Sequence, residues 1–189
     1  MRFGTLLSRI TNPKLGLRIT EIMYYILRIK IQKRKKYQIN QSIHAIFKLH
    51  QNNFQRRNIL DKIKDDSRFL IKKVSRTNFY KLMSSSQFVI SPFGLGELNY
   101  RDFETFLSKN VLLKPDLSHF CFNHNLFENN FTTIFFDLEL HDFDQKVNHL
   151  FNNIGLQKKI SENAYREFKK HQNALNEIVE SVFKKILIS

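Results

Sequence analysis

Three charged residues, Glu97, Arg101 and Glu104, are the residues of this sequence best placed to do chemistry. A helix turns by about 100° per residue, so it would bring them within about 60° of one another. The pattern predicts that this helix begins at Glu97, directly after a turn that contains Gly94 and Gly96. The N–H groups and dipole of a helix N-terminus attract anions, and carboxylates accept hydrogen bonds from hydroxyl groups. The combination suits a ligand with phosphates and hydroxyls, such as a nucleotide sugar.

The segment Phe88–His119 supplies the elements that must position these residues. An apolar run at 88–90 predicts a strand, a helical pattern follows over Glu97–Ser108, and a second apolar run at Val111–Leu113 predicts the next strand. A strand-helix-strand unit of this length gives parallel neighbours with a right-handed connection. Charges at this spacing are also common on solvated helices. Their place at the carboxyl end of a strand, where open α/β sheets bind ligands, favours a site.

This segment resembles the donor-binding half of B-type glycosyltransferases, which have two Rossmann domains, and especially the bacterial group-1 enzymes of surface polysaccharide assembly. The resemblance is densest over 88–119 and extends over about residues 55–170. The two glutamates are separated by one residue fewer than in the commoner pattern of that superfamily. The matching residues form three stretches: Ser91-Pro92-Phe93-Gly94-Leu95-Gly96-Glu97, Tyr100-Arg101-Asp102-Phe103-Glu104, and Leu113-Lys114-Pro115-Asp116 with Ser118-His119.

The resemblance implies a role for each residue of the expected site. Glu104 would hold the ribose of the donor, Glu97 would contact its sugar, and Arg101 or Lys114 would oppose the charge of the diphosphate. Glu97 and Arg101 are the expected catalytic residues. Because the departing diphosphate would be stabilised electrostatically, neither a metal nor another cofactor is required. The expected donor site comprises Gly94, Gly96, Glu97, Tyr100, Arg101, Glu104 and Lys114.

The rest of the chain alternates between strand and helix patterns. Further strands are predicted at Ile43–Phe47, Phe69–Val74 and Thr132–Phe136, and further helices near 54–63, 77–85 with Thr77 as N-cap, 142–150, 160–168 and 175–186. Residues 41–189 are therefore expected to form one Rossmann-like domain, a parallel sheet with helices on both faces. By the resemblance, Arg56 or Arg57 would approach the donor phosphates, although a solvated helix face is the preferred explanation for both.

The first 40 residues are expected to form a basic amphipathic helical leader. They contain ten Lys or Arg against the single acid Glu21, so most of the net charge of +14 lies there. Residues 20–36 fit a helix packed on the domain, a helix on an anionic membrane surface, or a nucleic-acid contact, in that order of preference. A basic nucleic-acid-binding or membrane-surface-binding protein without catalytic activity is thus the alternative function. It explains the charge but not the carboxylates after the glycine turn.

Several other classes of protein and site are not expected. Cys121 is the only cysteine, so no intramolecular disulfide can form and a reducing compartment is expected. The apolar run Ile22–Leu27 is too short for a signal peptide or a membrane span, which favours a cytoplasmic protein, with attachment to the inner membrane face as the variant. His119, Cys121 and His124 do not follow the spacing of a closed zinc site.

The acceptor half of a two-domain glycosyltransferase has no counterpart in the predicted elements. Residues 1–40 are too few for the Rossmann domain that would bind the acceptor. Three explanations fit: half of a split enzyme whose second chain supplies the acceptor domain, a truncated gene product, or a nucleotide-sugar-binding module.

Overall fold

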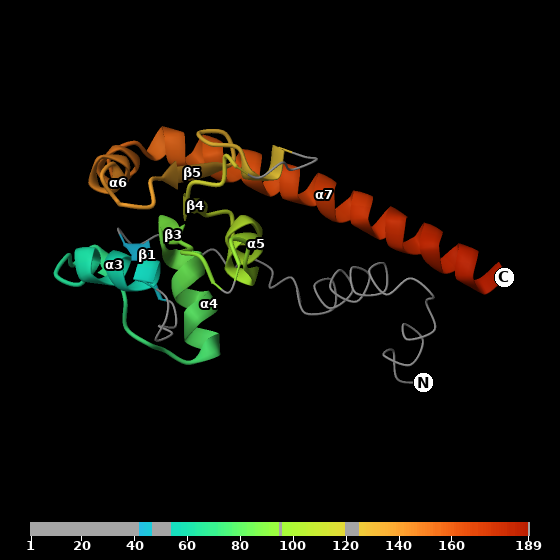
Figure 1. Ribbon diagram of the computed structural model, residues 1–189, viewed down its shortest axis with the longest axis horizontal. Helices are drawn as coiled ribbons and strands as arrows, with labels where there is room; N and C mark the ends of the chain where they lie inside the picture. Colours follow the sequence, from blue (N-terminus) through green and yellow to red (C-terminus); the bar gives the residue numbers. More distant parts are fainter. Residues whose placement is uncertain (1–41, 47–53, 95, 120–124, 189) are drawn as a thin grey trace. The chain divides into compact units, whose positions relative to one another are not determined.

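The computed structural model describes residues 42–46, 54–94, 96–119 and 125–188. These residues form an all-parallel sheet with helices on both faces (Figure 1), which confirms the predicted Rossmann-like α/β class. The leader 1–40, with residues 20–36, and also Cys121 and His124 lie outside the described residues. The strands are β1 (Ile43–His44), β2 (Phe69–Leu70), β3 (Phe88–Ile90), β4 (Val111–Pro115) and β5 (Thr133–Phe136); the helices are α3 (Phe54–Ile63), α4 (Arg76–Ser85), α5 (Tyr100–Leu107), η1 (Asn125–Phe127), α6 (Phe143–Phe151) and α7 (Ile154–Ile188).

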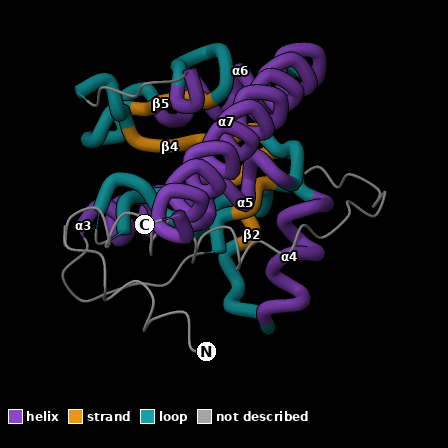
Figure 2. Tube along the Cα trace, turned by 90° about the vertical axis from the view of Figure 1, so that its right-hand side faces the viewer, coloured by secondary structure: helices purple, strands orange, loops and turns teal. Residues whose placement is uncertain are grey.

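The strand order is β2-β1-β3-β4-β5, and Figure 2 shows β4 and β5 side by side at the edge opposite β2. Ile43 of β1 lies opposite Phe69 of β2 on one side and Phe88 of β3 on the other. The chain therefore moves outward from β1 to β2, crosses back over β1 to β3, and continues in the opposite direction. This reversal is a topological switch point, and open α/β sheets bind ligands outside the carboxyl ends of the two strands that flank it.

The continuous apolar runs of the strands are explained by burial of both faces of the sheet. Ile43, Phe88 and Ile90 belong to the core under α3 and α6, the two helices that the Lys62–Asp144 ion pair joins at 2.7 Å. Side chains at the alternate positions, such as His44, face the α4 and α5 side. Figure 1 shows these two pairs of helices on opposite sides of the strands. The strand ends that flank the switch point are thus packed on both faces.

Several predicted boundaries are wrong. The helix expected from Glu97 begins only at Tyr100, because the Asn99 N–H donates to the Asp102 carboxylate at 2.9 Å and defines the first turn. α4 begins after Ser75 instead of Thr77, and the Ser75 hydroxyl accepts a hydrogen bond from the backbone of Asn78. β4 runs two residues beyond its predicted end, β1 and β2 are shorter than predicted, and the helices predicted at 160–168 and 175–186 are parts of the single helix α7.

The chain divides into two compact units, Arg34–Lys169, which contains the sheet, and Met1–Lys33 together with Lys170–Ser189. Of the second unit the structure describes only the last part of α7. Within the described ranges, no helix is both long enough and apolar enough to cross a membrane.

Phe106 anchors α5, and with it the candidate site, to η1 and α7. Its ring is fully buried and lies 5.4 Å from that of Phe127 and 6.2 Å from that of Phe168. We expect Phe106→Ala to lower the free energy of unfolding by about 3–5 kcal/mol, because truncation leaves a cavity in the core. Tyr100→Ala, on the same helix at a side chain that is 52% exposed, should cost less than about 1 kcal/mol. Urea denaturation measures both, and equal losses would contradict this packing.

Candidate functional site

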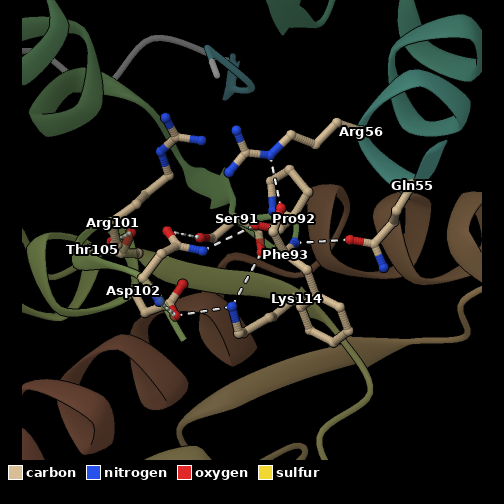
Figure 3. A network of polar contacts seen from close by, with 10 residues as sticks. Gln55, Arg56, Ser91, Pro92, Phe93, Arg101, Asp102, Thr105 and Lys114 are labelled. Carbon is tan, nitrogen blue, oxygen red and sulfur yellow. Dashed lines mark hydrogen bonds and ion pairs between the residues drawn. The ribbon is translucent and has the colours of Figure 1, made fainter. Parts of the chain in front are cut away.

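Two arginines from different helices lie together at the switch point. Arg56 is in the first turn of α3, which follows β1, and Arg101 is in the first turn of α5, which follows β3. Figure 3 shows both side chains on the same side of the β3–α5 loop, with their guanidinium groups turned toward one another. Gly94 of this loop lies close to Arg56, since a Cβ added at Gly94 would be 3.4 Å from an Nη atom of the guanidinium group.

The β3–α5 loop is bound by α3 through both backbone polar groups of Phe93. The Phe93 N–H donates to Gln55 Oε1 at 2.8 Å, and the Phe93 carbonyl accepts from Arg56 Nε at 2.7 Å (Figure 3). The Asn99 side-chain amide donates to the Pro92 carbonyl at 3.0 Å. The loop is therefore fixed to the helices that follow both β1 and β3, and its position is coupled to that of Arg56.

A buried ion pair lies on the other side of this loop. Lys114 Nζ is 2.9 Å from Asp102 Oδ2, and neither side chain has any exposed surface. The ammonium also donates to the Ser91 carbonyl at 3.4 Å, and lies 5.4 Å from the centre of the Phe93 ring. Burial raises the pKa of Asp102 and lowers that of Lys114, while the attraction between the two opposes both shifts. Lys114, predicted to face the diphosphate, is instead buried and contacts the β3–α5 loop through the Ser91 carbonyl and the Phe93 ring.

Charge repulsion acts between the two arginines. Burial, and after it the positive charge of Arg56, lower the pKa of Arg101 to about 10. Burial also lowers the pKa of Arg56. An anion bound between the two guanidinium groups would relieve this repulsion, and guanidinium forks match the geometry of phosphate oxygens.

Glu104 lies one turn after Arg101 and is engaged by α4. The Tyr80 hydroxyl of α4 donates to Glu104 Oε1 at 2.7 Å. The charge of Glu104 raises the pKa of Arg101, against the effects of burial and Arg56. The sequence predicts a helix near 77–85 but gives Tyr80 no role in the site. Its pairing with α5 follows from the return of the chain to β3, which no local pattern reveals.

The predicted charged stripe on one helix is wrong, because Glu97 precedes α5. Gly96 and Glu97 belong to the loop, and Glu97 Oε1 is 3.9 Å from His119 Nε2 at the end of β4. Glu97 is half-buried, whereas His119 and Tyr100, at the start of α5, are solvent exposed. The structure thus brings Arg101 together with Arg56, for which the sequence left a solvated position open, and separates Glu97 from Glu104.

Asp137, Glu139 and His141 are the metal-compatible group that the described residues contain, with ligand atoms within 4.8 Å of one another. The Asp137 carboxylate accepts the backbone N–H groups of His141 and Asp142, at 3.1 and 3.0 Å. These hydrogen bonds explain the group as the turn after β5, at the sheet edge away from the switch point.

His44 lies fully buried in β1, on the side of α4. The edge of its ring meets the ring of Phe79, with the centroids 4.6 Å apart. Burial and the neighbouring charge of Arg101 lower the pKa of His44 from 6.5 to about 3. His44 is therefore neutral in the folded protein at any pH near neutrality.

The shift of His44 predicts a loss of stability in mild acid. The unfolded chain binds the proton with a pKa near 6.5 and the folded protein only near 3, so this contribution is complete above pH 6.5 and declines as the pH falls. Between pH 7.5 and 5, we expect the wild type to lose about 2 kcal/mol more unfolding free energy than His44→Leu. Urea denaturation at both pH values measures the difference. Exposed His149→Gln is the control; a wild-type-like loss in His44→Leu would contradict the assignment.

The chain matches no protein-family model, and a search of curated proteins finds no matching relative. The likeness to glycosyltransferases therefore remains a prediction. The ligand of this region is therefore inferred from the two arginines, the β3–α5 loop and their neighbours.

Proposed function

We propose that this domain binds the diphosphate of a nucleotide sugar in the crevice between Arg56 and Arg101. The observation that carries the proposal is the convergence of these two guanidinium groups at the switch point of a parallel sheet. Ligands of doubly wound sheets bind at this place, and paired arginines favour phosphoryl groups. The sequence predicted that Arg101 would oppose the charge of a diphosphate. The position of Arg56 beside Arg101 supports this proposal.

The corresponding activity is that of the donor-binding half of a glycosyltransferase. In the transfer, an acceptor hydroxyl oxygen forms a bond to the anomeric carbon, the bond from that carbon to the diphosphate oxygen breaks, and the hydroxyl proton passes to a general base that the acceptor-binding chain would supply. Arg101 would oppose the charge that develops on the departing diphosphate, together with Arg56. Glu97, in the loop beside this crevice, would contact the sugar. No metal takes part in this scheme.

The other predicted donor residues have supporting positions in this proposal. Gly94 lies beside the Arg56 guanidinium group, and the Gly96 carbonyl closes the turn by accepting the Gly94 N–H at 2.9 Å. Tyr100 is exposed at the start of α5, where a ligand can reach it. Lys114 acts through the loop that it supports. Glu104 would accept a ribose hydroxyl.

A second chain would supply the acceptor domain in this proposal, with a glycan or lipid-linked acceptor as the sugar's destination. Residues 20–36 would place such a complex against an anionic membrane surface, at the cytoplasmic face. Both statements extend the proposal beyond the described residues.

The experiment is titration calorimetry with uridine, guanosine, adenosine and cytidine diphosphates and their sugars. We expect one base to be preferred and Arg56→Gln to weaken its binding at least about tenfold, because a charge-assisted hydrogen bond to phosphate contributes about 1.5–3 kcal/mol. Arg57→Gln is the matched control, since this neighbour on α3 is solvent exposed and has the same charge. Thermal unfolding of each variant establishes that it is folded.

Two results would count against the proposal. Absence of binding by every diphosphate, from folded wild-type protein, would reject the crevice as a donor site. Equal weakening of diphosphate binding by Arg56→Gln and Arg57→Gln would mean that the affinity depends only on the net charge of the protein.

A further inference from the structure

We infer that Glu104 sets the selectivity of the crevice against small inorganic anions. Its fixed negative charge disfavours a bare phosphate or pyrophosphate, whereas a ligand that carries hydroxyl groups beside its phosphates can donate hydrogen bonds to the same carboxylate. This inference rests on the proposed function, because it requires anions to bind between Arg56 and Arg101. It adds a selectivity role for Glu104, and a positioning role for Tyr80, to that proposal.

Helix α4 fixes the carboxylate and the guanidinium together. Tyr80 donates its hydroxyl hydrogen to Glu104 Oε1 at 2.7 Å, and the ring of its neighbour Phe79 lies 5.5 Å from the guanidinium carbon of Arg101. The two rings pack edge to face at 5.4 Å. Glu104 and Arg101 are also three residues apart on α5, which places their Cβ atoms on one helix face. The negative charge is therefore held close to one of the two positive charges that define the crevice.

The electrostatic effect of Glu104 opposes that of Arg56. Arg56 lowers the pKa of Arg101 and Glu104 raises it, so the carboxylate offsets part of the positive potential that an incoming anion meets. A carboxylate accepts hydrogen bonds but cannot donate them, and the same is true of fully ionised phosphate oxygens. The two groups therefore repel one another without a compensating hydrogen bond. A hydroxyl group supplies the missing donor. Selectivity of this kind arises from a penalty on the wrong ligand as well as from contacts to the right one.

The test compares wild type with Glu104→Gln in calorimetric titrations of inorganic pyrophosphate and of uridine diphosphate. The amide has the size of the carboxylate and its oxygen can still accept the Tyr80 hydrogen bond, so the fold should be retained. We expect pyrophosphate to bind about fivefold more tightly to Glu104→Gln, because one nearby negative charge is removed. The ratio of uridine diphosphate affinity to pyrophosphate affinity should fall, since the hydroxyl loses a charged acceptor.

Glu128→Gln is the matched control, because it makes the same change of charge at an exposed position between β4 and β5. Its pyrophosphate affinity should equal that of wild type. A double variant, Arg101→Gln with Glu104→Gln, should show a smaller gain over Arg101→Gln than the gain of Glu104→Gln over wild type, as expected if Glu104 acts through Arg101.

The outcomes separate this inference from the proposed function. If pyrophosphate binds and Arg56→Gln weakens it, but Glu104→Gln binds it no more tightly than wild type, the selectivity role is overturned and the anion site stands. If neither pyrophosphate nor any of the four nucleoside diphosphates binds to folded wild type or Glu104→Gln, the proposed function fails and this inference with it.

Discussion

The buried ion pair between Asp102 and Lys114 is the interaction on which the rest of the site depends. Two charges without solvent contact are costly unless each is paired and hydrogen-bonded. Here Asp102 also accepts the Asn99 N–H, and Lys114 donates to the Ser91 carbonyl. The pair therefore joins the end of β4 to the beginning of α5 and to the loop between β3 and α5. Once these are joined, the position of Arg101 is set.

The crevice itself results from the order of the strands. Because β1 and β3 are neighbours, the helices that follow them begin at the same edge of the sheet and on opposite faces. Arg56 and Arg101 each occupy the first turn of one of these helices, and α3 binds the β3–α5 loop through both backbone polar groups of Phe93. Two cations brought together in this way repel one another, and Glu104 offsets only part of the repulsion. An anion bound between them would relieve this repulsion, which is the physical basis of the proposed donor site.

The glycosyltransferase resemblance and the structure agree on the location of a site but differ on how its residues act. The resemblance places Lys114 against the diphosphate, whereas its ammonium is buried under the loop. It gives no place to Tyr80, which orients Glu104. It treats Glu97 and Glu104 as one motif, yet Glu97 lies in the loop near His119 and Glu104 lies between two helices. Function is therefore better argued from Arg56 and Arg101 than from the spacing of the glutamates.

The sequence by itself determined the fold class, because apolar runs such as Val111–Leu113 and the glycine turn at Gly94 are local signals that alternate with helical patterns along the chain. It also located Arg101 at the carboxyl end of β3. It did not reveal that the helix begins at Tyr100, since the Asn99–Asp102 contact that defines its start is a choice among several compatible caps.

Only the tertiary structure decided which strands are neighbours. The order of the strands in turn determined the contacts of Arg56 and Tyr80 and the burial of Lys114. The contacts of these residues join segments 37, 24 and 12 positions apart: Arg56 with Phe93, Tyr80 with Glu104, and Lys114 with Asp102. Local propensity and periodicity describe the shape and apolar face of one element at a time. The pairing of parallel strands depends on how all the faces are buried together, so the residues that meet at the switch point could not be identified before the sheet was assembled.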